Sequence, residues 1–196
     1  MPPKNKYSEE DIIKAAFNVV RKSGWQNCTA RSIAEELGSS TMPIYSYLSS
    51  MADLKTKILQ KATDLMIDYQ TRIKTDIDFL DMGVGYVLFA KEEKNLFRLM
   101  YRENISEKND TEFKKNRDVS FIGYAFETLL DRLAGSTVLA GFSREEKKKI
   151  LYHAWIFSHG LAVLINNGIR SDLDETGIIE ILKNFGRCLI NGSRPV

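Results

Sequence analysis

Apolar residues recur at helical spacing along almost the whole of this chain. In the first segment Ile12, Ala16 and Val19 fall on one face of a helix, and Gly24 is placed to end it. No run of alternating β-branched residues is long enough to form a half-buried strand. The pattern therefore predicts an all-α fold of about nine helices. We expect the helices near residues 8–23, 29–37, 41–48, 51–73, 78–90, 93–104, 112–134, 143–166 and 174–191.

Three candidate capping boxes precede stretches of helical periodicity. In a capping box, a Ser or Thr hydroxyl accepts a hydrogen bond from a first-turn backbone N–H, and an acidic residue three positions later reaches back to the cap. The pairs are Ser8 with Asp11, Ser50 with Asp53, and Ser143 with Glu146. These pairs support helix starts at three of the predicted positions.

The segment from Thr29 to Leu48 has the organisation of a helix-turn-helix. Two helices of about two turns each are joined by a tight turn at Gly38, because glycine tolerates the left-handed backbone that such a turn requires. The second helix is too short to be stable alone, so packing must hold it. Its outward positions carry hydroxyls and apolar groups, which suit contacts with phosphates and thymine methyl groups.

The stretch from Ile12 to Leu54 resembles the N-terminal signature of the tetracycline-repressor (TetR) family. The positions that carry the resemblance are Ile12, Ala15, Ala16, Val19, Gly24, Thr29, Ile33, Ala34, Gly38, Ser40, Ile44, Tyr45, Tyr47, Leu48 and Leu54. The chain departs from the family pattern at Met42, Tyr47 and Leu48, where Gly, His and Phe are common. Where the family commonly has a phosphate-binding Lys, this chain has Met51, and Lys55 or Lys57 is the nearest replacement. The resemblance implies a homodimeric transcription regulator, a repressor rather than an activator, that an effector releases from a near-palindromic DNA operator.

The resemblance also implies which residues contact DNA. Thr29 and Arg31 would hold a phosphate at a helix N-terminus, and the start of the recognition helix would lie nearest the bases. Two alternatives stay open: Tyr45 as a core aromatic residue, and Arg31 as a surface residue paired with Glu35. The expected DNA-binding residues are Thr29, Arg31, Ser40, Thr41, Met42, Pro43, Tyr45, Tyr47 and Lys55.

The rest of the chain is expected to regulate the first part. We expect a helix-turn-helix DNA-binding domain at residues 1–50 and a helical regulatory and dimerisation domain at 51–196, with the helix at 51–73 connecting them. The segment Trp155-x-x-x-His159-Gly160 resembles a motif of one TetR subgroup. Candidate contacts to a small apolar or aromatic effector are Tyr86, Phe97, Tyr101, Tyr124, Trp155 and His159. The alternative for each is a place in an ordinary helical core.

Charge and reactive residues narrow the function further. The net charge is +2, and residues 1–57 hold the whole excess, with eight Lys or Arg against six Asp or Glu. That bias permits nucleic-acid binding without requiring it. His153 and His159 face different ways on a helix, and no Cys or acid completes a metal site. We therefore expect no catalytic, cofactor or metal site, although a small hydrolase using His159 is a rival function.

Cysteine content and hydropathy bear on location and partners. Two distant cysteines, Cys28 and Cys188, and the absence of a signal-like N-terminal stretch favour a cytoplasmic protein that does not enter a membrane. The last two predicted helices carry more apolar residues than an outer pair needs, which favours a homodimer. The main rival is a helical small-molecule-binding or scaffold protein that has lost specific DNA reading.

Overall fold

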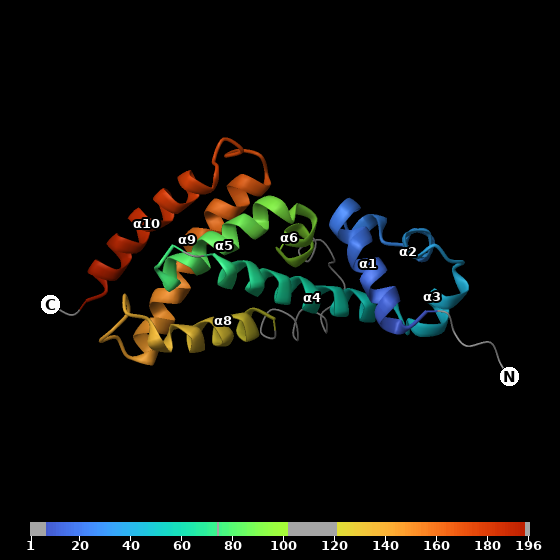
Figure 1. Ribbon diagram of the computed structural model, residues 1–196, viewed down its shortest axis with the longest axis horizontal. Coiled ribbons are helices and arrows are strands. Elements are labelled where there is room, and N and C mark those ends of the chain that lie inside the picture. The colour runs from blue at the N-terminus through green and yellow to red at the C-terminus, as the bar shows by residue number, and fades with distance from the viewer. Residues whose placement is uncertain (1–6, 74, 102–120, 195–196) are drawn as a thin grey trace, which may run out of the picture. The chain divides into compact units, whose positions relative to one another are not determined.

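The computed structural model describes residues 7–73, 75–101 and 121–194, with side chains from residue 123 in the last range. These residues form nine α-helices and two short 3-10 helices, and no strand is found among them. The predicted all-α class is therefore confirmed (Figure 1). The helices are α1 Glu9–Ser23, η1 Trp25–Asn27, α2 Ala30–Leu37, α3 Met42–Tyr47, α4 Met51–Arg72, α5 Asp78–Glu92, α6 Lys94–Tyr101, α8 Phe121–Arg132, η2 Leu133–Gly135, α9 Arg144–Asn166 and α10 Glu175–Gly192.

Caps and breakers in the sequence determine most helix ends. The capping box at Ser8 is complete, because its hydroxyl accepts from the Asp11 N–H at 3.2 Å and its own N–H donates to Asp11 at 2.9 Å. A second complete box starts α9 at Ser143. At Ser50 the hydroxyl accepts from the Asp53 N–H at 3.0 Å. The expected connection at 105–111 and the first part of the expected helix at 112–134 lie outside the described residues.

The first of two compact units contains the described residues 7–63 and 93–101. Its central helix is α1, which packs against α2, α3 and α6. Ile12, Ile33 and Ile44 are buried in its core, so one side chain from each of the first three helices anchors that helix. This packing holds α3, which has only six residues and no stability of its own.

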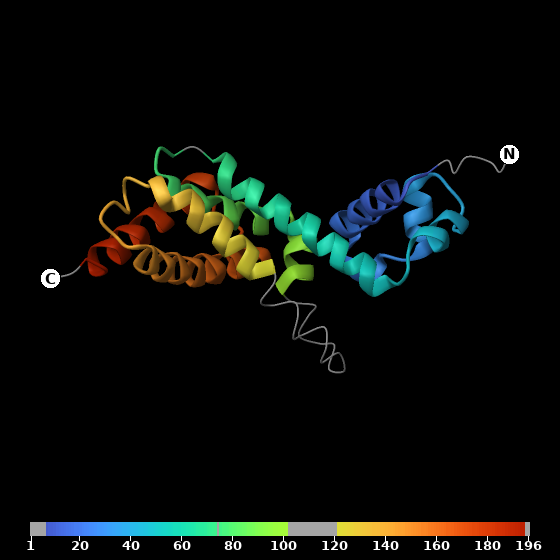
Figure 2. The ribbon, with the colours of Figure 1, turned by 90° about the horizontal axis from the view of Figure 1, so that it is seen from below.

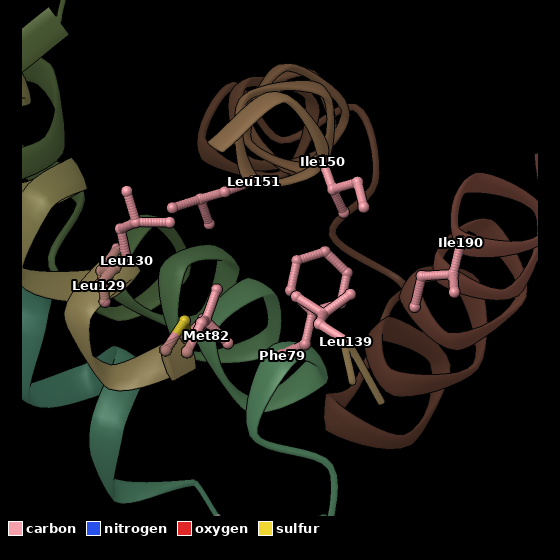
Figure 3. Packing of buried hydrophobic residues seen from close by; sticks show 9 residues of the cluster. Phe79, Met82, Leu129, Leu130, Leu139, Ile150, Leu151 and Ile190 are labelled. Carbon is pink, nitrogen blue, oxygen red and sulfur yellow. The ribbon is translucent and has the colours of Figure 1, made fainter. Parts of the chain in front are cut away.

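The second compact unit contains the described residues 64–73, 75–92 and 121–194. Its central helix is α5, against which both α9 and α10 pack (Figures 1 and 2). Gly85 allows α5 to approach α4, because a Cβ at this position would lie 2.1 Å from the carbonyl oxygen of Tyr69. One apolar cluster of this unit is drawn in Figure 3. It consists of Phe79, Met82, Leu129, Leu130, Leu133, Leu139, Ile150, Leu151 and Ile190.

The compact units do not divide the chain at residue 50. Leu54 and Ile58 of α4 are buried in the first unit, and so is Leu96 of α6. The side-chain amide of Asn95 also donates to the carbonyl oxygen of Arg21 at 3.0 Å, which ties α6 to α1. Residues 51–63 and α6 therefore complete the N-terminal core, while the functional division into DNA-binding and regulatory domains stays a prediction.

None of the described helices combines the length and the apolar content needed to cross a bilayer.

Candidate nucleic-acid interface

The turn between α2 and α3 is built around Gly38. This residue has φ of 65° and ψ of 41°, the left-handed conformation that glycine adopts without steric cost. The N–H of Ser39 donates to the carbonyl oxygen of Ala34 at 2.9 Å, and that of Gly38 donates to Glu35 at 3.2 Å. These bonds close the end of α2 and redirect the chain into α3. The predicted turn is confirmed.

The short helix α3 has one anchored face and one open face. Ile44 is buried between α3 and the rest of the N-terminal core, whereas Met42 is 76% exposed and Tyr45 is 74% exposed. Pro43 lies in the first turn, where its missing N–H costs little. The alternative placement of Tyr45 as a core aromatic residue is therefore wrong. Ser40 and Thr41 are exposed beside this face, and Tyr47 is half-buried.

The N-terminus of α2 is capped by Thr29. Its hydroxyl accepts from the Ser32 N–H at 3.1 Å, and the Ser32 hydroxyl accepts from the Thr29 N–H at 2.9 Å. Thr29 is therefore the N-cap expected at this helix start, and its capping-box partner is Ser32 in place of the usual acidic residue. The side chain of Thr29 is thus engaged by the helix itself, and the remaining first-turn N–H groups are the donors available for a phosphate.

Arg31 is both a candidate phosphate ligand and a surface ion-pair partner. Its Nε lies 3.0 Å from Glu35 Oε1, and its side chain is 87% exposed. The alternative pairing considered from the sequence is therefore present in the structure. Since an exposed i,i+4 pair contributes little free energy, the guanidinium can exchange Glu35 for another anion at small cost.

The expected phosphate ligand Lys55 requires a correction. This residue is 3% exposed, and its ammonium lies 5.3 Å from the centre of the Trp25 ring. Burial over an indole face is a cation–π arrangement, and it leaves no surface for a phosphate. Trp25 lies on the short helix η1, which the sequence analysis did not anticipate. Lys57 is the more exposed residue of the two alternatives.

Three other cations of this unit, Arg21, Lys22 and Lys57, are paired with carboxylates. Lys57 pairs with Glu9 and with Asp53, and these contacts raise the pKa of its ammonium. Lys22 lies 2.7 Å from Glu36, and this hydrogen bond lowers the pKa of Glu36. The buried carboxylate of Glu93 accepts from Arg21 Nε at 2.6 Å. The interface around α3 therefore offers hydroxyls and apolar groups rather than a basic patch.

Three of the six predicted effector residues lie together in the second unit. The Tyr86 hydroxyl is 2.8 Å from His159 Nδ1, and the rings of Trp155 and His159 lie 5.5 Å apart. Burial lowers the pKa of His159, so its neutral form is favoured. Tyr86 and Trp155 also line a cavity of about 40 Å³, and so does Gln70, whose buried Oε1 has no hydrogen-bond partner among the described residues.

The other three predicted effector residues are placed elsewhere. Phe97 and Tyr101 belong to α6 in the first unit, where their rings pack with centroids 4.9 Å apart. Tyr124 of α8 is half exposed. The expectation that aromatic residues from all these helices would meet came from composition, which does not specify tertiary packing.

A larger cavity of about 320 Å³ in the second unit was not predicted. It lies between α5, α9 and α10, and none of the six predicted effector residues is among the described residues that line it. One signal for it was present in the sequence. Lys183 and Arg187 interrupt the apolar periodicity of α10 one turn apart.

Two further features of the described residues bear on function. No group of three or more His, Cys, Asp or Glu side chains is arranged to hold a metal ion within the described ranges. On α9, Ile156 and Leu164 are exposed, and the ring of Phe157 stacks on Phe185 of α10 with centroids 3.9 Å apart. These residues form an apolar face that solvent would not favour.

Comparison with known proteins identifies the fold. The structure is similar to a crystal structure of a transcriptional regulator from Rhodococcus sp. RHA1, with a TM-score of 0.66 and 16% identity over 97% of this chain and 100% of that chain. A TetR-like transcriptional regulator from the same organism matches with a TM-score of 0.56 and 15% identity over 91% of this chain and 92% of that one.

One curated relative is similar in sequence. An HTH-type transcriptional regulator of Mycobacterium tuberculosis is 22% identical over 182 residues, which cover 88% of this chain and 77% of the relative. No family model matches the chain. The chain therefore has the fold of the TetR-like transcriptional regulators, and the resemblance seen between Ile12 and Leu54 is confirmed at the level of the fold. Membership of the Trp-x-x-x-His-Gly subgroup stays a prediction.

Proposed function

We propose that this chain is a sequence-specific DNA-binding transcription regulator of the TetR type. The observation that carries the proposal is that α3 has one buried and one exposed face. Ile44 is buried on one face, whereas Met42 and Tyr45 are about three-quarters exposed on the other. Neither of these two side chains contributes to the core of the first unit, so both are available to a ligand. The major groove of DNA accepts such a helix, and its thymine methyl groups contact apolar side chains.

We assign the contacts by the position of each residue on the helix-turn-helix. Ser40, Thr41, Met42 and Pro43 would reach base edges from the start of α3. Tyr45, Tyr47 and the N-terminus of α2, at Thr29 and Arg31, would bind phosphates and position the protein without reading sequence. Lys55 is left out of this set because it is buried.

The proposed regulator acts as a homodimer. One recognition helix of six residues reads too few base pairs to be specific in a genome, whereas two copies read two half-sites. The apolar face of α9 around Ile156, Phe157 and Leu164 is suited to a two-fold contact. Light scattering should give about twice 22.4 kDa for the wild type, and Ile156→Glu with Leu164→Glu should give a folded monomer. A monomeric wild type that binds a palindrome tightly would contradict this part.

The finer regulatory role follows from the resemblance alone. We propose a cytoplasmic repressor, without catalytic activity or cofactor, that leaves its near-palindromic operator when a small molecule occupies the second unit. The helix α4 contributes residues to both compact units and is the continuous segment through which ligand and DNA binding would be coupled.

The proposal is tested by selecting bound duplexes from a randomised pool at moderate salt. The wild type should enrich one motif with two related half-sites. A pool that stays random after repeated rounds would contradict the proposal.

A second candidate function is a helical ligand-binding protein that no longer reads DNA. The observation that favours it is the pairing of Arg21, Lys22 and Lys57 with carboxylates, which leaves little positive potential near α3. Non-specific DNA affinity separates the two functions. A regulator binds random duplex weakly and its motif at least a thousandfold more tightly, on the order of 4 kcal/mol or more, whereas the alternative shows no such difference.

A further inference from the structure

The cavity between α5, α9 and α10 has the size of a small-molecule site. Its volume is about 320 Å³, at the lower end of the range typical of ligand pockets. It adjoins the small cavity beside Tyr86 and Trp155, and four residues line both: Phe79 and Gly83 of α5, and Ala154 and Ser158 of α9. Its lining combines apolar side chains with three basic ones, whereas an ordinary packing defect is lined by apolar side chains alone.

One part of the cavity lining is apolar and comes from two helices. Phe79 and Leu80 come from α5, and Leu182 and Ile190 come from α10. Figure 3 shows Phe79 and Ile190 directed toward one another from these two helices. Gly186 lies on the α10 side, and a Cβ built on it would meet no atom within 4 Å. There is therefore open space next to Gly186, and the part of the lining given by Phe79, Leu182 and Ile190 is apolar.

The other part of the lining is basic. Lys183 and Arg187 lie one turn apart on α10, and Arg194 follows just after the helix ends. Of the described side chains that line the cavity, these three are basic and none is acidic. Within the described part of the chain, none of these three side chains makes an ion pair or a hydrogen bond, and all three residues are exposed. Like charges at i and i+4 disfavour a helix slightly, and a bound anion would relieve that repulsion.

We propose that this cavity binds a small amphipathic organic acid. Its apolar body would lie between Phe79, Leu182 and Ile190, and its carboxylate or phosphate would accept hydrogen bonds from Lys183 and Arg187. A guanidinium and an ammonium on adjacent turns match an oxyanion in charge and in donor geometry. The ligand class rests on the cavity alone, and only its role as the effector rests on the proposed function.

A second copy of the chain fits the cavity and its basic rim less well than a small anion does. In a two-fold dimer both copies use the same patch, so a contact through this surface would bring the basic residues of the two copies together. Juxtaposed like charges oppose such a contact. The apolar face of α9 around Ile156 and Leu164 carries no such penalty, which leaves the cavity for a ligand of opposite charge.

The test compares three probes on the full chain in the absence of DNA. Octanoate carries the apolar body and the anion, 1-octanol carries the same body without charge, and inorganic phosphate carries charge alone. Calorimetry should show saturable octanoate binding with one site per chain, octanol at least about tenfold weaker, and no binding of phosphate. Absence of saturable octanoate binding, equal binding of octanol, or phosphate binding as tight as octanoate would each overturn the proposal.

Variants of the lining locate the site. Lys183→Gln and Arg187→Gln should each weaken octanoate by roughly tenfold and leave octanol unchanged. Gly186→Leu should fill the cavity and weaken both organic probes. Gly192→Leu is the matched control, because a Cβ on this α10 glycine also meets no atom within 4 Å and the residue does not line the cavity. Octanoate binding that survives all three lining variants would overturn the assignment.

The outcome of the binding experiment and the outcome of the DNA selection are independent of each other. If octanoate binds as expected and no DNA motif is enriched, the ligand proposal is supported and the proposed DNA recognition is contradicted. If a motif is enriched and octanoate does not bind, the DNA recognition is supported and the ligand proposal is contradicted.

Discussion

Positive charge is arranged differently around the helix-turn-helix of the first unit and around the cavity of the second unit. In the first unit Arg21, Lys22, Arg31 and Lys57 each have a carboxylate partner, and Lys55 is buried over an indole ring. In the second unit, the basic residues along one side of α10 surround a cavity and have no partner among the described residues.

The difference indicates where each kind of ligand is recognised. A helix-turn-helix without a basic patch must gain specificity from hydroxyls and apolar contacts, with phosphates held largely by backbone N–H groups. A cavity with unpaired cations instead favours a ligand that brings its own negative charge. The first unit would thus bind the phosphates of DNA, and the cavity of the second unit would bind a small organic anion.

The largest expected effect comes from the anchored face of α3. Ile44→Ala should lower the free energy of unfolding by about 2–5 kcal/mol, because it opens a cavity where α3 meets the core. Met42→Ala, two residues away on the exposed face, should change stability by less than about 0.5 kcal/mol. Chemical denaturation followed by circular dichroism measures both. Equal losses in the two variants would contradict the two-faced description of α3.

In the second unit the closest helix approach should be the most sensitive to added volume. Gly85→Ala places a methyl group against the Tyr69 carbonyl, and we expect a loss of about 1–3 kcal/mol. Gly160→Ala, where a Cβ on α9 meets no atom within 4 Å, should instead gain about 0.5–1 kcal/mol in helix propensity. The order of the two denaturation midpoints checks the packing of α4 against α5.

A smaller effect is expected from freeing a cation beside the recognition helix. Glu35→Gln removes the partner of Arg31, so its guanidinium becomes available to a phosphate. Affinity for selected and random duplexes alike should rise about two- to fivefold, and the salt dependence should steepen. The double variant Arg31→Gln with Glu35→Gln should lose this gain. If the double variant binds as tightly as the single one, Arg31 is not a phosphate ligand.

The smallest effect concerns pH and the neutral imidazole of the second unit. Burial lowers the pKa of His159 in the folded state, so its contribution to stability is present above the unfolded value of about 6.5 and is lost as pH falls through the folded pKa. Unfolding at pH 5 and pH 7 should therefore show a smaller pH dependence in His159→Gln than in the wild type. His153→Gln, at an exposed position of the same helix, is the control. If the free energy of unfolding changes equally with pH in the wild type and in His159→Gln, His159 does not contribute to the pH dependence of stability.

Local signals in the sequence predicted the helices and the turn. Ser8, Gly24 and Gly38 determine backbone geometry within a few residues of their own positions, so their effects are visible without tertiary structure. The same holds for the buried position of Ile44, which follows from helical periodicity and the shortness of α3.

Features that depend on long-range packing were not predictable in this way. Lys55 is buried because η1 brings Trp25 to it from thirty residues earlier, and nothing in the local pattern marks that contact. Phe97 and Tyr86 both belong to aromatic-rich segments, yet they fall into different compact units. The cavity on α10 likewise exists only when three helices meet, although its basic residues stand out in the sequence.

Parallel selection from one randomised duplex pool with the wild type and with Met42→Ala tests the central claim most directly. Recognition through the exposed face of α3 predicts one enriched motif for the wild type, and a relaxed preference at one position of each half-site for the variant, with a cost of about 1–3 kcal/mol on the original motif. Identical motifs and affinities for both proteins, or no enrichment for either, would contradict it.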